Sequence, residues 1–216
     1  MAAFLIVDFE FTKYTRPVGR PNGFFPEIIE IGAVKYDEQG NELGSVQNFV
    51  KPHFYPKQAK EGMEFCMITE QDMKSAIPFP QMVEKLAALY VPGETRFVAW
   101  GGEDYKVLDT GCRRHGLENP ILKEDYLDLA LAYRLLKGDG YTTGLKKAGE
   151  ELGTASEGLW HTAYDDAANT GRILFKLIEQ GWTPERFEQD KEAAKEQARL
   201  KAQAKAEARA ARRAGE

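Results

Sequence analysis

Apolar and polar positions alternate in blocks over the first fifty residues. An apolar run at residues 4–7 has the length expected of a buried strand, and the polar segment 8–12 follows it directly. Residues 28–36 and 46–50 are again strand-like, and the turn-forming segment 37–42 separates them. This pattern predicts three antiparallel strands at the start of the chain, the first of which carries acidic residues at its C-terminal end.

The pattern changes from residue 69 onward, where apolar residues recur at the three- and four-residue spacing of helices that pack on a core. Short apolar runs at residues 97–100 and 126–129 predict two further strands. The order of elements predicts an α/β fold in which helices flank a mixed five-stranded sheet. The expected helices lie within residues 80–90, 104–114, 129–136, 142–153 and 162–180.

The composition changes again near the C-terminus, where Ala, Lys, Arg, Glu and Gln dominate. Phe187 and Leu200 are the only large apolar residues there, so this segment is not expected to build a core. Six basic residues stand against two acidic ones from Arg199 onward, which makes the far end locally positive. We therefore expect a domain at residues 1–182 and a charged helical or disordered tail at 183–216. The tail is either a solvated helix or an arm for nucleic acid or a protein partner.

Charge and cysteine content narrow the class of protein. The formal net charge of −5 argues against a broad basic surface for long nucleic acid, although bound divalent cations would reverse the field locally. Cys66 and Cys112 form no cluster, so neither a disulfide framework nor a zinc site is expected. No apolar run approaches the roughly 18 residues of a membrane span, and residues 1–7 lack the pattern of a secretory signal. These features predict a cytoplasmic protein without a membrane segment.

Asp8 and Glu10 are the first candidates for chemistry. They are two positions apart at the end of a strand, so both carboxylates point to the same side of the sheet. Two like charges this close repel unless a cation lies between them. A metal site is therefore one interpretation of the pair, and a solvated surface pair is the other.

Two later segments add candidate groups. Asp104 follows a buried strand and a Gly-Gly turn at the start of a helix, where it is a third carboxylate or a helix-start residue. His161 and Asp166 are five residues apart, about 140° around a helix, and would not share one face. Either His161 lies on the preceding loop, or Asp165 is its partner. A capping or surface histidine is the alternative for this segment.

In chain order, Asp-x-Glu, then Asp, then His-x-x-x-x-Asp resembles the motif of the DEDDh 3′-5′ exonucleases, which have the ribonuclease H-like fold. The resemblance covers roughly residues 4–180 and is closest to the branch with the sporulation inhibitor KapD and the Eri-1 type RNA exonucleases. Shorter motifs carry it as well, at residues 9–12, 24–32, 100–101, 106–108, 127–129 and 163–167.

The resemblance implies that Asp8, Glu10, Asp104 and Asp166 hold two divalent cations, Mg²⁺ or Mn²⁺, because hard oxygen ligands suit both. One cation would activate a water and the other would stabilise the leaving 3′ oxygen, with Glu10 counted among the catalytic residues. His161 would be the general base, since an imidazole accepts a proton near neutral pH. The implied reaction releases nucleoside 5′-monophosphates from single-stranded 3′ ends, with RNA slightly favoured over DNA.

The resemblance also implies contacts to nucleic acid. Backbone groups at Phe11 and Thr12 would hold the terminal sugar, and Phe65 would line the pocket of the terminal base, unless Phe65 packs in the core. Glu103 departs from relatives that carry an aromatic residue before the aspartate, which puts one face of the base pocket in doubt.

Two further functions stay open at this point. One is a regulatory binding protein on a nuclease fold. The retention of all five catalytic positions argues against it. The other is a proofreading subunit that docks on a polymerase through its tail, although the tail lacks an apolar stripe beyond Leu200. The oligomeric state is also open.

Overall fold

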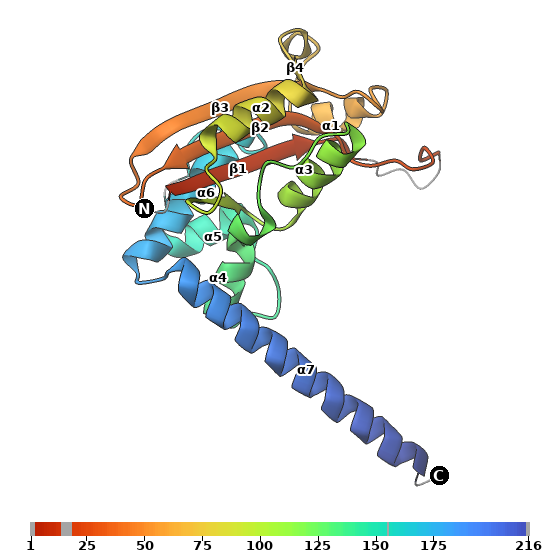
Figure 1. The fold of residues 1–216 in the computed structure, drawn as a ribbon, viewed down its shortest axis with the longest axis vertical. Coiled ribbons are helices and arrows are strands. Elements are labelled where there is room, and N and C mark those ends of the chain that lie inside the picture. Colours follow the sequence, from red (N-terminus) through yellow and green to blue (C-terminus); the bar gives the residue numbers. More distant parts are fainter. Residues whose placement is uncertain (1–2, 14–18, 155, 215–216) are drawn as a thin grey trace.

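The computed structural model describes residues 3–13, 19–154 and 156–214, with side chains placed as far as residue 207. Its centre is a mixed sheet with the strand order β4-β3-β2-β1-β5-β6 (Figure 1). The first three strands pair antiparallel, as the sequence predicted, and β5 and β6 continue the sheet parallel to β1. The strands are β1 (Ala3–Phe11), β2 (Ile28–Tyr36), β3 (Glu42–Lys51), β4 (Ile77–Pro78), β5 (Thr95–Ala99) and β6 (Tyr126–Asp128).

The sheet has six strands where the sequence predicted five. The additional strand is β4, which pairs with the end of β3 through only two residues, Ile77 and Pro78. An edge strand of two residues shows no periodicity, so the sequence pattern contained no signal for it.

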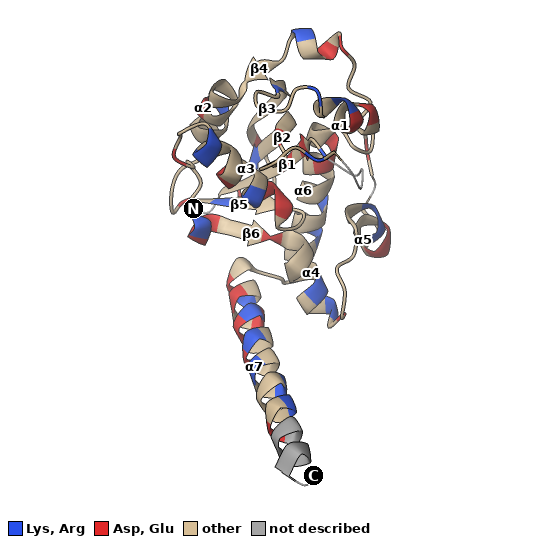
Figure 2. Cartoon of the chain, turned by 90° about the vertical axis from the view of Figure 1, so that its right-hand side faces the viewer, with Lys and Arg blue, Asp and Glu red and all other residues tan. Residues whose placement is uncertain are grey.

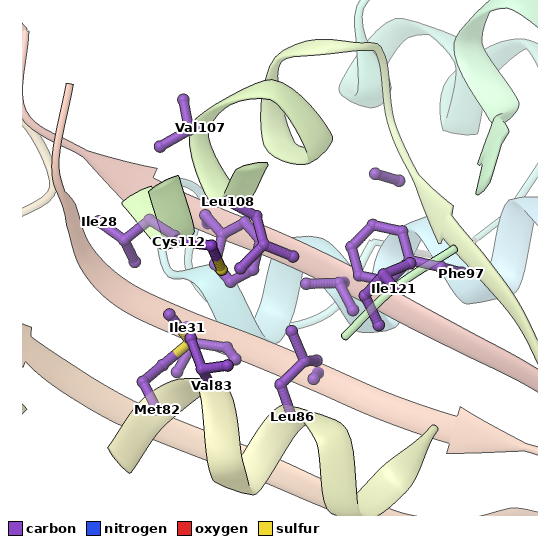
Figure 3. Packing of buried hydrophobic residues seen from close by; sticks show 14 of the residues in the cluster. Ile28, Ile31, Met82, Val83, Leu86, Phe97, Val107, Leu108, Cys112 and Ile121 are labelled. Atoms are coloured by element: carbon purple, nitrogen blue, oxygen red, sulfur yellow. The ribbon is translucent and has the colours of Figure 1, made fainter. Parts of the chain in front are cut away.

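Helices cover both faces of the sheet, and alternation along β1 separates the two faces. Leu5, Val7 and Phe9 belong to a core cluster that is shared with α2 and α3, whereas Phe4 and Ile6 belong to a second cluster shared with α4, α5 and α6. Figure 3 shows the first cluster, in which side chains from α2 and α3 meet against the strands. The helices are α2 (Phe79–Leu89), α3 (Glu103–Arg114), α4 (Leu129–Lys137), α5 (Leu145–Leu152) and α6 (Ala163–Glu179).

Two short 3-10 helices and one α-helix were not expected from the sequence. The α-helix, α1 (Ala59–Phe65), carries a glycine and lacks a regular apolar stripe, so its sequence gives no helical periodicity. The 3-10 helices are η1 (Asp72–Lys74) and η2 (Lys123–Asp125).

The charged segment at the C-terminus is a single helix, α7 (Pro184–Ala214), whose outer part extends away from the sheet and its flanking helices (Figure 1). Its first turn is an exception to the expectation that this segment adds nothing to the core, because Phe187 is only 2% exposed and packs with Trp182 in the second core cluster. Basic and acidic residues are interspersed along the helix from there to residue 207 (Figure 2). Among the described residues, no helix combines the length and apolar character needed to cross a membrane.

Candidate metal centre

Asp8 and Glu10 lie in the last part of β1, on the face where Phe4 and Ile6 contact the second core cluster. The alternation of a strand puts residues 4, 6, 8 and 10 on one side of the sheet, and this is the side that α6 covers. Asp8 is half-buried and Glu10 is buried. The two carboxylates therefore point to the side of the sheet that is covered by α6.

Gly32 allows the start of α6 to approach the sheet closely. Gly32 pairs with Asp8 in the register of β1 and β2, and a Cβ atom at Gly32 would lie 2.1 Å from the carbonyl carbon of Ala163. Glu30, two residues earlier on the same strand, accepts a hydrogen bond from the Ala163 N–H. Backbone-to-backbone contact and this hydrogen bond together fix the first turn of α6 against β2.

The first turn of α6 brings Asp166 to Glu10. A ligand atom from each of Glu10, His161 and Asp166 lies within 4.8 Å of the others, although Glu10 is about 150 residues away from the other two in sequence. Asp166 Oδ2 accepts a hydrogen bond of 3.1 Å from the His161 N–H. The other oxygen, Asp166 Oδ1, is buried and has no hydrogen-bond partner among the described residues.

His161 lies on the loop before α6 and not in the helix. Its φ of 66° is in the left-handed region, and Thr162 is the N-cap residue of α6. The backbone reverses there, so the exposed imidazole reaches the site while Asp166 projects from the first helical turn. Asp165 points elsewhere, because its Oδ2 accepts a hydrogen bond of 2.8 Å from the Leu159 N–H and so holds the same loop from the other end.

Asp8 and Asp104 do not belong to this group of three, although the charges of Asp104, Glu10 and Asp166 all act on Asp8. Asp104 is buried in the first turn of α3, and its Oδ1 accepts a hydrogen bond of 2.9 Å from the Phe9 N–H. Burial is the main cause that raises the pKa of Asp104 to about 7 and the pKa of Asp166 to about 6. Burial and then the neighbouring charges of Asp104, Glu10 and Asp166 raise the pKa of Asp8 well above its usual range.

These properties fit a divalent cation. Carboxylates that are buried together repel one another, and a cation removes both the repulsion and the cost of ionising them. Asp166 Oδ1 is the oxygen that such an ion would satisfy, since burial without a partner is costly for a polar atom. All the candidate carboxylates provide hard oxygen ligands, the type that Mg²⁺ and Mn²⁺ prefer.

The residues expected to contact nucleic acid differ in their availability. Phe65, at the end of α1, is 51% exposed, and its ring centroid lies 4.4 Å from that of His161, so it is not a core residue. Phe11 is half-buried at the end of β1. Thr12 is fully buried, and its N–H and hydroxyl already bond to the main chain of Glu27. Exposed Glu103 pairs with Lys106 at 2.7 Å.

Two neighbours of the acidic cluster were not identified from the sequence. Cys66 Sγ donates a hydrogen bond of 2.9 Å to Glu10 Oε2, across 56 residues of chain. Glu30 lies opposite Glu10 in the register of the sheet, and burial raises its pKa to about 7. The spacing of neither residue in the sequence points to the site, because each comes beside Glu10 only through the tertiary structure.

Comparisons with known proteins identify the family of the chain. The model of an exonuclease family matches residues 5–174. The chain is 39% identical over 181 residues to the probable 3′-5′ exonuclease KapD of Bacillus subtilis, a match that covers 82% of the chain and 85% of KapD. It is 28% identical over 203 residues to ERI1 exoribonuclease 2 of Mus musculus, covering 83% of the chain but only 29% of that longer protein.

Solved structures share the fold. The nuclease domain of 3′hExo, a DEDDh family member bound to rAMP, superposes with a TM-score of 0.71 at 24% identity, covering 83% of this chain and 92% of that one. At this identity the likeness shows the ribonuclease H-like fold alone. The family match over most of the chain and the 39% identity to KapD show that the chain belongs to the DEDDh 3′-5′ exonuclease family.

Proposed function

We propose that the protein is a two-metal 3′-5′ exonuclease that shortens single-stranded nucleic acid from its 3′ end, with RNA favoured over DNA. Asp8, Glu10, Asp104 and Asp166 hold the two cations, Mg²⁺ or Mn²⁺, and His161 is the general base. The observation that carries the proposal is the convergence of Glu10, His161 and Asp166 within 4.8 Å, beside a buried carboxylate oxygen without a partner.

When bound, the cations supply a nucleophilic water and stabilise the charge that develops on the leaving oxygen. The residues of the chain hold the general base in place and accept the proton. The hydrogen bond from the His161 N–H to Asp166 fixes the loop, and the imidazole accepts the proton that the water loses as it attacks phosphorus. The bond from phosphorus to the 3′ oxygen of the preceding nucleotide breaks. The released nucleotide keeps its phosphate on the 5′ oxygen.

The surroundings of His161 support an end-specific enzyme. Phe65 is an exposed aromatic ring next to the imidazole, and Lys13 Nζ lies 4.6 Å from the centre of that ring. An aromatic ring can stack on any base, so a terminal nucleotide is held here without strong sequence preference. RNA is favoured because the mouse relative, which is similar over 83% of this chain, is an exoribonuclease by name.

A labelled-oligonucleotide assay tests the proposal. RNA and DNA of the same sequence, labelled at the 5′ end, are incubated with Mg²⁺, with Mn²⁺ or with chelator, beside an Asp8→Ala control. We expect a metal-dependent ladder that shortens from the 3′ end and disappears in the control. Tight binding without any ladder would contradict the enzyme and favour a regulatory binding protein. Equal activity in Asp8→Ala would exclude the proposed metal centre.

A further inference from the structure

A cavity adjoins the candidate metal centre on the side of α5. It has a volume of about 670 Å³ and lies between the first turns of α5 and the loop before α6. His161 and Asp166 form one wall, and Lys146 and Trp160 contribute to the others. Phe65, which contacts His161, does not line this cavity. His161 therefore has the Phe65 ring and the cavity as two separate neighbours.

The cavity repeats the combination of groups that is found at Phe65. Lys146 Nζ lies 5.9 Å from the ring centre of Trp160, just as Lys13 Nζ lies 4.6 Å from that of Phe65. Trp160 is half-buried, which leaves part of its ring open to the cavity. Two pairs of one aromatic residue and one lysine therefore flank the candidate general base.

The charges of the cavity favour an anion at one end. Lys146 makes no ion pair with any described side chain, whereas its neighbour Lys147 lies 3.9 Å from Glu151. Glu150 also lines the cavity, one helical turn beyond Lys146, so an anion is favoured only at the Lys146 end. A flat ring beside a free ammonium group suits a base linked to a phosphate.

We propose that this cavity binds the penultimate nucleotide of the strand, with its base on Trp160 and its 5′ phosphate at Lys146. This inference rests on the proposed exonuclease function. The scissile bond joins the terminal nucleotide to the penultimate one, so hydrolysis at the metal centre requires one nucleotide site on each side. Phe65 with Lys13 supplies the first site, and Trp160 with Lys146 supplies the second.

The base contact is tested by removing each partner in turn. An RNA oligonucleotide is compared with the same RNA that carries an abasic nucleotide at the penultimate position. Base stacking on an aromatic residue has a typical strength that corresponds to about 5-fold to 150-fold in kcat/KM. We expect the abasic substrate to lose this factor with the wild-type enzyme, and Trp160→Ala to lose it on the normal RNA. The two losses should not multiply when they are combined.

Two variants separate stacking from a structural role of Trp160. Trp160→Phe keeps an aromatic ring and should recover most of the loss on normal RNA. Leu159→Ala changes an exposed side chain of the same loop and should behave like wild type. If Trp160→Ala loses the same factor on the abasic substrate as on normal RNA, Trp160 only supports the loop and the proposed base contact is wrong.

The phosphate contact has a separate readout. Lys146→Ala should raise KM with little change in kcat, and should reduce the slope of log affinity against log salt by about 0.7 for one phosphate on a single strand. Lys85→Ala, on the exposed side of α2, is the matched control and should change neither quantity. An unchanged salt slope in Lys146→Ala would overturn the phosphate assignment.

Different outcomes would contradict the exonuclease function and the penultimate-nucleotide site. If the wild-type protein produces no metal-dependent ladder on either RNA, the exonuclease function itself is wrong. If it cleaves both RNAs at the same rate, the function stands and the penultimate-nucleotide site is wrong.

Discussion

Replacing Gly32 by alanine tests whether the contact between β2 and α6 positions the metal centre. Gly32 lies opposite Asp8 in the sheet, and a Cβ atom there would be 2.1 Å from the carbonyl carbon of Ala163 and 2.2 Å from the Tyr164 nitrogen. These neighbours are backbone atoms and cannot rotate away. The start of α6 would have to move.

The size of the movement follows from ordinary contact distances. Non-bonded carbon atoms are most stable at about 3.5–4.0 Å, so the first turn of α6 must retreat by more than about 1 Å. That turn carries Asp166 and directly follows His161, while Glu10 stays on β1. A displacement of about 1 Å in a catalytic group can lower the rate about 100-fold. Overpacking typically costs about 1–3 kcal/mol of unfolding free energy, or about 2–4 °C in Tm per kcal/mol at this size.

The assay combines the rate of RNA shortening in Mg²⁺ with thermal denaturation. Gly32→Ala should fold, melt several degrees lower and lose about two orders of magnitude in kcat. Gly140→Ala is the matched control, because no described heavy atom lies within 4 Å of its added Cβ, and it should retain wild-type activity. A kcat of Gly32→Ala within threefold of wild type would refute the claim that this contact fixes the distance between Glu10 and Asp166.

Three further predictions concern individual carboxylates. Asp104 has a folded-state pKa of about 7, above its usual unfolded value, so its contribution to stability is present in acid and lost as pH rises through 7. In chelator, Asp104→Asn should therefore gain Tm over wild type from pH 5 to pH 8, and a gap that shrinks with pH would contradict this. Asp166→Ala should abolish hydrolysis, whereas Asp165→Ala, which removes the acceptor of the Leu159 N–H, should retain measurable activity in the same assay; the reverse outcome would reassign the ligand. Glu27→Ala leaves the N–H groups of residues 53–55 without their acceptor and should lower the free energy of unfolding by about 3 kcal/mol, as measured by urea denaturation. A decrease of less than about 1 kcal/mol would contradict this.

Some features of the candidate site could be predicted because they depend on the local spacing of residues in the sequence. The two-residue period of β1 is visible at Asp8 and Glu10, and the five-residue spacing from His161 to Asp166 is incompatible with one helical face. The structure places His161 outside α6 and directs Asp165 to the loop. Local geometry posed the choice between the two aspartates, and the family resemblance favoured Asp166, which the structure places beside Glu10 and His161.

Features that depend on distant parts of the chain were not predictable. The hydrogen bond from Cys66 to Glu10 and the pairing of Glu30 with Glu10 come from tertiary packing. Phe187 stands in a charged segment of the sequence, yet it is buried because α7 starts against α4. Gly32 resembles any glycine in a strand until α6 is placed over it.

The docking of α7 through its first turn has a consequence for measurements of stability. Past Phe187 the helix is held mainly by its own backbone and by exposed ion pairs such as Lys191 with Glu188 and Lys195 with Glu192. Such a segment loses helicity gradually with temperature, whereas the domain unfolds cooperatively. Far-ultraviolet circular dichroism will superimpose a sloping component on a sigmoidal one. Trp182 is buried in the same core cluster as Phe187, so its fluorescence follows the cooperative unfolding of the domain.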